Sequence, residues 1–396
     1  MTVWTRDFRL FFTARTVSML GFSMVPVATA LGMRQAGYGA TGVGLTLAAG
    51  TGPMVILILF GGVLMDRFTP RRMMVAADLV RVVSQATTAV LFITGRPQLW
   101  QILLLSAVNG VATAMYSPGV AGTIPRITAD VQKANATLRV SEAIVQLVGP
   151  GVAGALVGLA GVGTVFAMDA AGFAISAACL LLMRTRVIAG AEAEEPVLRR
   201  LREGWHEFRS RTWMWSVILV WVIFGITLFG PLTPLGSLLI TDAYGETAYG
   251  LVLSAGGAGT IVGGLVAMRV RPARPLAAGA AGLLLFAVVP LTIALGAPLH
   301  LLMAGQVVGG AAWAFWSVMW ATSVQTLVPG DALNRVSAYE IGGSMMAMPV
   351  GNAIAGPVAD VVGPENVLGF SVLVAISGCA ALLAVPAVRG VRQATA

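Results

Sequence analysis

The chain alternates between long apolar runs and short polar segments. Twelve of the runs have the length of a membrane-crossing helix, which needs about 20 apolar residues. The predicted spans are 8–33, 41–65, 73–94, 99–125, 138–160, 164–184, 213–240, 247–268, 275–296, 299–327, 336–360 and 365–388. Glycine and proline inside several spans are compatible with membrane helices. The pattern predicts an all-α, multi-pass membrane protein.

Composition points the same way, because 57% of the residues are hydrophobic and only 11% are charged. The first apolar run lacks a small-residue cleavage site, so we expect it to stay as a helix. Cys179 and Cys379 lie in separate runs without metal-ligand spacing, and we expect no disulfide framework and no bound metal. The net charge of +8 arises from short loops, which favours the lipid bilayer over nucleic acid as partner.

The basic residues also predict the orientation. Of the 25, only Arg34 and Arg96 fall in outer loops if the N-terminus is inside, Arg15 and Arg81 fall within spans, and the other 21 lie inside. Cytoplasmic loops of membrane proteins are rich in Lys and Arg. We therefore expect both termini in the cytoplasm.

Residues 185–212 form the one long predicted loop and divide the chain into a bundle at 1–184 and a bundle at 213–396. Within the loop, residues 197–211 have the apolar spacing of a helix lying on the inner membrane surface. The loop is either a linker between the two bundles or a regulatory, lipid-binding segment.

An internal repeat supports two related halves. Residues 37–50 recur as residues 243–256 with eight of fourteen positions identical, and both copies begin the second helix of their half. Parallel repeats in transporters are typical of two bundles that rock against each other.

The stretch from Gly61 to Arg81 reads GGVLMDRFTPRRMMVAADLVR, two apolar runs joined by a short arginine-rich turn. It resembles the loop between the second and third helices of the major facilitator superfamily, Gly-x-x-x-Asp-Arg-x-Gly-Arg-Arg. The matching or displaced positions are Gly62, Asp66, Arg67, Arg71 and Arg72. Thr69 and Pro70 depart from the pattern, and the basic pair comes one residue late. The resemblance implies that Asp66 belongs to a cytoplasmic gate.

The continuation AADLVR resembles the drug-exporter branch that contains macrolide and enterobactin exporters. This resemblance implies two six-helix bundles and a secondary transporter of a bacterial inner membrane, which we expect to be a monomer. Helix 5 carries Gly149, Pro150 and Gly154, which resemble part of the antiporter signature Gly-Pro-x-x-Gly-Gly. Pro150 removes a helix hydrogen bond, so a kink is expected there.

Ionisable residues inside apolar spans are costly and usually functional. They are Arg15, Asp78, Arg81, Glu142, Asp169 and Glu340. Asp78 and Arg81 have the spacing of a local ion pair that orders the inner gate. Glu142, on the helix with Pro150, is our first choice for a proton-linked carboxylate, followed by Glu340, Asp169 or Asp78. Arg15 is either a structural partner of one acid or a cation that keeps a carboxylate ionised.

The family arrangement lines a central cavity with helices 1, 4, 7 and 10. It implies that the cavity residues include Asn109, Tyr116, Trp221, Gln306, Trp313 and Trp316. Trp313, Trp316 and Trp320 share one helical face. Aromatic walls with few polar groups suit bulky amphipathic or cationic small molecules. The stripe could instead form an interfacial aromatic belt.

Enzyme motifs are missing from the sequence: it has no GxxxxGK[ST] and no GxSxG, and Lys133 is its only lysine. We expect no enzyme activity and no cofactor. The preferred hypothesis is proton-coupled export of small amphipathic molecules by alternating access. An uptake permease or facilitator, and a non-transporting membrane scaffold, are the alternatives.

Overall fold

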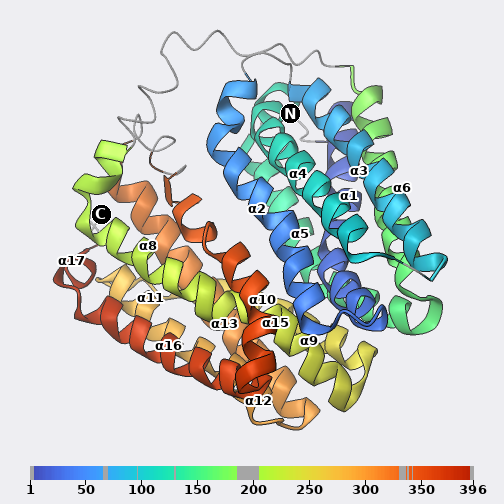
Figure 1. Ribbon diagram of the computed structural model, residues 1–396. Helices are drawn as coiled ribbons and strands as arrows, with labels where there is room; N and C mark the ends of the chain where they lie inside the picture. Colours follow the sequence, from blue (N-terminus) through green and yellow to red (C-terminus); the bar gives the residue numbers. More distant parts are fainter. Residues whose placement is uncertain are drawn as a thin grey trace. The chain divides into compact units, whose positions relative to one another are not determined.

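The computed structural model describes residues 4–65, 70–95, 97–128, 131–184, 205–329, 336, 339–340 and 342–392. These residues contain twelve helical segments long and apolar enough to cross a membrane (Figure 1). The predicted all-α fold with twelve spans is therefore confirmed. Asp66 and Arg67, and most of the predicted surface helix, lie outside the described residues.

The chain forms two compact units. The first comprises Met1–Tyr38 and Leu45–Glu194, and the second comprises Gly39–Gly44 and Glu195–Ala396. Each unit has its own set of buried apolar side chains.

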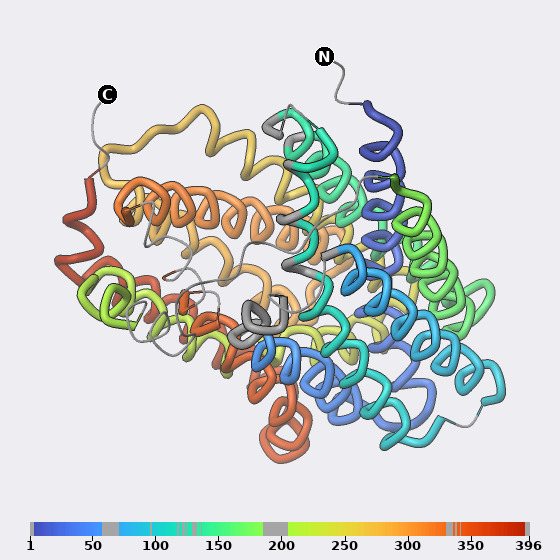
Figure 2. The backbone as a smooth tube through the Cα atoms, turned by 90° about the horizontal axis from the view of Figure 1, so that it is seen from above, coloured from blue at the N-terminus to red at the C-terminus, as the bar shows by residue number. Residues whose placement is uncertain are grey.

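The helices of the first unit are α1 (Arg6–Gln35), α2 (Gly39–Met65, of which Gly39–Gly44 belong to the second unit), α3 (Pro70–Ile93), α4 (Leu99–Ile127), α5 (Val131–Ala160) and α6 (Val162–Leu182). The helix α6 packs along both α1 and α3, and α3 also packs on α4. The two helices α3 and α6 lie side by side in both views (Figure 1 and Figure 2). Small residues permit the close approach: a Cβ atom on Gly21 of α1 would lie 2.9 Å from the Cα atom of Asp169 on α6.

The second unit contains α8 (Thr212–Phe224), η1 (Gly225–Phe229), α9 (Gly230–Tyr244), α10 (Glu246–Arg269), α11 (Pro275–Leu283), η2 (Leu284–Ala287), α12 (Val288–Ala294), α13 (Leu299–Leu327), α15 (Met348–Val362), α16 (Pro364–Ala384) and α17 (Pro386–Arg389). The helices α10 and α13 pack closely. The reason is again small residues, because Gly259 and Gly263 of α10 face the backbone of Val307 and Ala311.

Several spans of the second unit are less regular than the sequence predicts. The π-helical turn η1 interrupts the predicted span 213–240, and the 3-10 turn η2 interrupts the span 275–296. The last predicted span, 365–388, ends at Ala384, because Pro386 begins the separate short helix α17.

The described end of the predicted surface helix, residues 205–210, is helical. Phe208 there is buried, and its ring stacks on that of Tyr339 at a centroid distance of 6.1 Å. This end of the helix is therefore held by the second unit through aromatic packing, in addition to any contact with a membrane surface.

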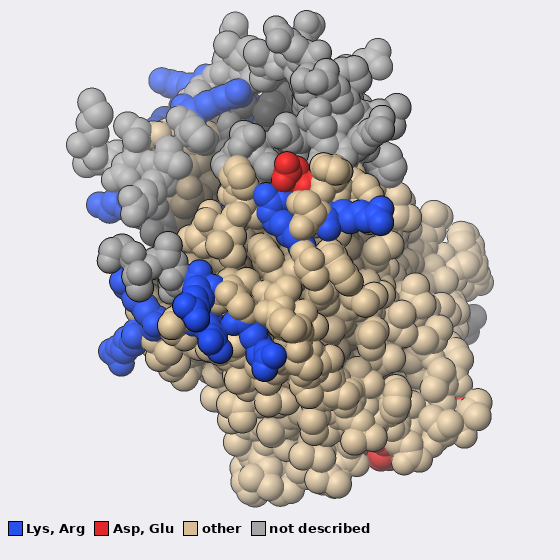
Figure 3. All heavy atoms as spheres, turned by 90° about the vertical axis from the view of Figure 1, so that its left-hand side faces the viewer, with Lys and Arg blue, Asp and Glu red and all other residues tan. Residues whose placement is uncertain are grey.

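Charge is unevenly distributed over the second unit. Its exposed arginines include Arg209, Arg269, Arg271, Arg274, Arg389 and Arg392. They lie where α10 and α16 end and where α8 and α11 begin, which is one end of an up-and-down bundle. Figure 3 shows the basic residues of one face gathered toward one end, with a broad surface beyond them that carries almost no charge.

Candidate functional site

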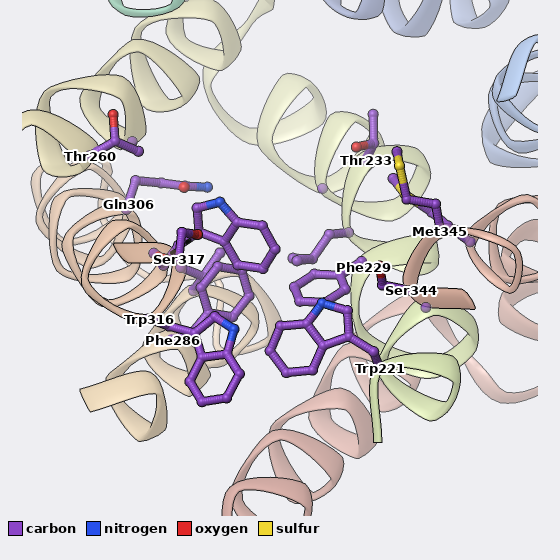
Figure 4. A pocket seen from close by; sticks show the side chains of 18 of the residues that line it. Trp221, Phe229, Thr233, Thr260, Phe286, Gln306, Trp316, Ser317, Ser344 and Met345 are labelled. Atoms are coloured by element: carbon purple, nitrogen blue, oxygen red, sulfur yellow. Dashed lines mark hydrogen bonds between the residues drawn. The ribbon is translucent and has the colours of Figure 1, made fainter. Parts of the chain in front are cut away.

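The second unit forms an open pocket of about 630 Å³. Helices α8, α9, α10 and α13 and the segment before α15 supply most of its lining, and Figure 4 shows the side chains that point into it. Its aromatic and polar lining residues include Trp221, Phe229, Tyr249, Phe286, Gln306, Trp313, Trp316, Ser317, Trp320, Glu340 and Ser344. All of them belong to the second unit.

Stacked aromatic rings form one wall of the pocket. Trp221 stacks on Trp316 with ring centroids 5.1 Å apart, and on Trp313 at 6.2 Å. Phe229 meets Trp313 edge to face at 5.2 Å, and Trp320 continues the stack from Trp316 at 6.1 Å. Ring pairs with these geometries fix one another beyond the effect of burial. The wall is therefore a continuous set of aromatic rings packed on one another, in which Trp221 and Trp316 are buried.

Polar groups in the pocket are few. The Nε1–H group of Trp320 donates a 2.7 Å hydrogen bond to Oε1 of Glu340, which is the acidic residue of the lining. Gln306 projects from α13 on the same side of the pocket as Ser317 and Trp316, as Figure 4 shows. The hydroxyl of Tyr249 is buried and has no hydrogen-bond partner among the described residues. The pocket thus combines apolar area, a carboxylate and a few hydrogen-bonding groups, as small-molecule sites do.

Irregular backbone shapes this site. Gly225 and Phe229 of the π-helical turn η1 both line the pocket, and so does Phe286 of the 3-10 turn η2. A π turn holds one more residue than an α turn, which changes the direction of the side chains that follow, and such turns often occur at functional sites. Apart from Gly225 itself, no residue in the sequence signals η1.

The predicted cavity residues separate into two groups. Trp221, Gln306, Trp313 and Trp316 do line the pocket. Asn109 and Tyr116 do not, because they belong to the first unit. Tyr116 is 2% exposed and packs in the core of that unit, with the guanidinium carbon of Arg81 4.9 Å from its ring centroid. Tyr116 therefore packs in the core of the first unit and does not line this pocket, as the sequence had suggested it would. The missed pocket residues Phe229, Tyr249 and Phe286 have no spacing pattern that marks them.

The intramembrane charges of the first unit form two groups, and the first surrounds Glu142. Arg15 of α1 lies 3.1 Å from one carboxylate oxygen of Glu142, and Arg139 lies 3.1 Å from the other. Glu142 is therefore bound by two guanidinium groups and ties α1 to α5. This contact is compatible with both roles expected for Arg15, structural partner of an acid and cation that keeps a carboxylate ionised.

The second group is buried between α3 and α6. Asp78 and Arg81 form the i, i+3 ion pair at 3.6 Å, and Ser176 donates a 2.6 Å hydrogen bond to the other oxygen of Asp78. About two helical turns away, Gln85 donates to Oδ2 of Asp169. Both carboxylates are fully buried. Gln85 and Ser176 were missed from sequence because they are uncharged, although each lies seven residues from one of the acids.

The signature-loop and kink candidates lie in the helices of the first unit. Arg71 and Arg72 lie in the first turn of α3, and Gly62 lies in α2. Gly149 faces α1, where its Cβ position would lie 2.8 Å from Cβ of Ser23. Pro150 and Gly154 lie inside α5, which runs unbroken from Val131 to Ala160. Among the described residues no cluster of His, Cys, Asp and Glu could hold a metal ion.

Curated relatives are efflux proteins. The chain is 21% identical over 211 residues to macrolide efflux protein A of Enterococcus faecalis, covering 52% of this chain and 65% of the relative. It thus spans slightly less than two thirds of that relative. It is 24% identical over 407 residues to the enterobactin exporter EntS of Salmonella paratyphi A, covering 98% and 94% of the two chains.

A crystal structure of the nucleoside transporter NupG has a TM-score of 0.74 to this chain. It is 14% identical, and the match covers 94% of this chain and 99% of the NupG chain, which supports the fold. A family model described as transmembrane secretion effector matches residues 3–394. The chain therefore belongs to the transmembrane secretion effector family within the major facilitator superfamily of transporters.

Proposed function

We propose that the protein exports small amphipathic molecules, above all organic cations, in exchange for protons. The observation that carries this proposal is the pocket of the second unit, which combines a tryptophan wall with Glu340, the one acidic side chain among the described residues of its lining. A cation over a tryptophan face gains about 0.5–2 kcal/mol, more when water is excluded. A flat, singly charged organic molecule fits both features of the lining.

Glu340 is suited to bind the positively charged group of the ligand. Trp320 occupies Oε1 through its indole N–H, which leaves the other oxygen for a ligand ammonium or iminium group. The polar groups of Gln306 and Ser317 would orient the rest of the molecule. Neutral molecules of similar shape should bind through the aromatic wall alone.

Alternating access would move this pocket between the two sides of the membrane. The internal repeat and the two compact units support rocking of one unit against the other. The excess of basic residues in the predicted inner loops supports an orientation with both termini in the cytoplasm. The similarity to bacterial efflux proteins supports a bacterial inner membrane. Protons, the bilayer and the small molecule are the partners, and one chain would suffice.

Export is favoured over uptake because the curated relatives are an efflux protein and an exporter. The fold alone leaves open an uptake permease, a facilitator without a proton step, or a scaffold. The test uses inside-out membrane vesicles from an expressing strain, with ethidium as the probe and vesicles from the empty-vector strain as control.

We expect ethidium to accumulate in these vesicles when their interior is acidified, and to leave when an uncoupler collapses the gradient. Accumulation only in right-side-out vesicles would mean uptake. Downhill ethidium flux that is unchanged by the uncoupler would indicate a facilitator. Ethidium binding by purified protein without any flux would mean a scaffold, and absence of both binding and flux would refute the proposed substrate class.

A further inference from the structure

The buried polar residues between α3 and α6 are arranged as two matching stripes. The stripes are Asp78, Arg81 and Gln85 on α3, and Asp169, Phe173 and Ser176 on α6. The spacings i, i+3, i+7 and i, i+4, i+7 each return to one face of a helix. All six side chains are buried.

Because the two helices run in opposite directions, the stripes pair in three layers. Ser176 bonds to Asp78 at one end, the ring of Phe173 lies 4.9 Å from the guanidinium carbon of Arg81 in the middle, and Gln85 bonds to Asp169 at the other end. We call this arrangement the α3–α6 ladder. Seven residues of helix separate its ends, which is about 10 Å along the axis.

The ladder holds two carboxyl groups and one guanidinium group. A buried charge without an opposite partner is strongly unfavourable. From other helices, Tyr116 of α4 lies under Arg81, and Arg15 of α1, which acts on Asp78, is paired with Glu142 of α5. The second arginine on Glu142, Arg139, is 84% exposed and screened by solvent. With both carboxyl groups ionised, the ladder would carry one negative charge in excess.

The contacts identify the group that relieves this excess. Asp78 has both Arg81 and Ser176 as partners. Asp169 has Gln85 alone, and its Oδ1 atom is buried without a hydrogen-bond partner among the described residues. The same Oδ1 lies against Gly21 of α1, where a Cβ atom would collide with it. A neutral carboxylic acid satisfies this environment better than an anion does.

We infer that Asp169 holds the coupled proton and that Arg81 controls its release. This inference rests on the proposed function, because it names the proton site of the proposed exchange. Arg81 pairs with Asp78 in the present arrangement, while the charge of Asp169 also acts on it and its Nε atom has no described partner. When Arg81 turns to Asp169, the O–H bond of that carboxyl breaks and its proton leaves. Asp78, relieved of Arg81, takes up a proton from water on the opposite side of the membrane from the one that receives the Asp169 proton. The ladder then keeps the same net charge while one proton is exchanged.

Glu142, the first choice from the sequence, fits this role less well. Its two oxygens already have the guanidinium partners Arg15 and Arg139. Because two guanidinium groups neutralise its negative charge, Glu142 is stable as an anion and does not need a proton. Asp169 has no cation in direct contact among the described residues.

The first test reads the proton directly and needs no transport. Infrared spectra of purified protein in H₂O and D₂O should contain the deuterium-sensitive carbonyl band of a buried carboxylic acid. Asp169→Asn should remove the band, and the exposed control Asp360→Asn should leave it in place. Asp78→Asn should also weaken or remove the band, because Arg81 loses its ion-pair partner and Asp169 then becomes its only counter-ion in the ladder. Gln85→Leu, which keeps the acid and removes its hydrogen bond, should raise the band frequency. A wild-type protein without the band, or a band that persists in Asp169→Asn, overturns the inference.

The second test separates this inference from the proposed function. Wild-type vesicles and Asp169→Asn vesicles are compared for ethidium accumulation under an imposed pH gradient and for ethidium exchange without one. We expect the variant to lose at least about tenfold in accumulation and to keep exchange. Wild-type transport that ignores the gradient would refute proton coupling itself. Coupled wild-type transport together with a fully coupled Asp169→Asn variant would refute only the role of Asp169.

Discussion

Replacing Glu340 by Gln should distinguish charged from neutral ligands at the pocket. The glutamine side chain is close in shape to the natural one, and its amide oxygen can still accept the hydrogen bond from Trp320. Only the negative charge is removed. The aromatic wall of Trp221, Trp313 and Trp316 is untouched, so any effect on affinity reports on the charge.

The size of the effect follows from the position of the carboxylate. A ligand cation about 5 Å from Glu340, at an effective dielectric constant of about 20, gains roughly 3 kcal/mol from the charge. Glu340 is partly exposed, and screening reduces the expected value to about 1.5–3 kcal/mol. That range corresponds to binding weakened by about 10- to 150-fold.

Quenching of the pocket tryptophans by ethidium, measured with purified protein, gives the two dissociation constants. Hydroethidine, the neutral reduced form of the dye, serves as the matched ligand and should bind both proteins almost equally. Glu365→Gln, at an exposed acid in the first turn of α16, serves as the matched variant and should change neither constant. Equal loss for both dyes, or no loss for ethidium, would refute electrostatic recognition by Glu340.

Packing and charge elsewhere in the chain lead to three further expectations. Ser176→Ala should lower the unfolding free energy by about 1.5–3 kcal/mol, since it removes a buried hydrogen bond to Asp78, whereas Ser377→Ala, which loses only a bond to its own exposed helix, should not; thermal unfolding in detergent measures both. Gly149→Ala should destabilise by about 1–3 kcal/mol through overlap with Ser23, and Gly264→Ala, with open space at its Cβ position, should be neutral or slightly stabilising; equal effects would contradict the packing argument. The third expectation concerns topology and uses a protein from which Cys179 and Cys379 have been removed. Cysteines introduced at Gly95 and Gly296 should react with an impermeant thiol reagent added outside, and a cysteine at Ala193 should react only when the reagent is inside. The reverse labelling would refute the proposed topology.

The membrane fold could be predicted from the sequence because apolar length is a strong, local signal. Its irregular points could not. The π turn at Gly225–Phe229 depends on how this turn and α9 pack against α15, and no residue pattern encodes that contact. The linker shows the same limit, since the amphipathic spacing predicted a helix but not the burial of Phe208 against Tyr339.

Residues of the candidate site could be predicted from the sequence where their side chains are unusual for an apolar membrane span. Tryptophans at helical spacing and acids inside apolar spans stand out, and Trp313, Trp316 and Glu340 do meet in one pocket. Gln85 does not stand out, because its importance comes from the residue opposite on another helix. Tyr116 was misplaced for a related reason: position on a helix indicates a face, and only the neighbours decide whether that face is solvated or packed.

The pocket has a thermodynamic consequence, because all the described residues of its lining belong to the second unit while the α3–α6 ladder lies within the first. Cargo and proton would then never compete for one atom, and neither could displace the other directly. Their influence on each other would be a linkage free energy carried by a shared conformational equilibrium, and it would be reciprocal: a bound cation would change proton affinity by the same factor as a bound proton changes cation affinity. Selectivity for cargo and the number of protons exchanged would accordingly be separable traits, open to independent change in evolution.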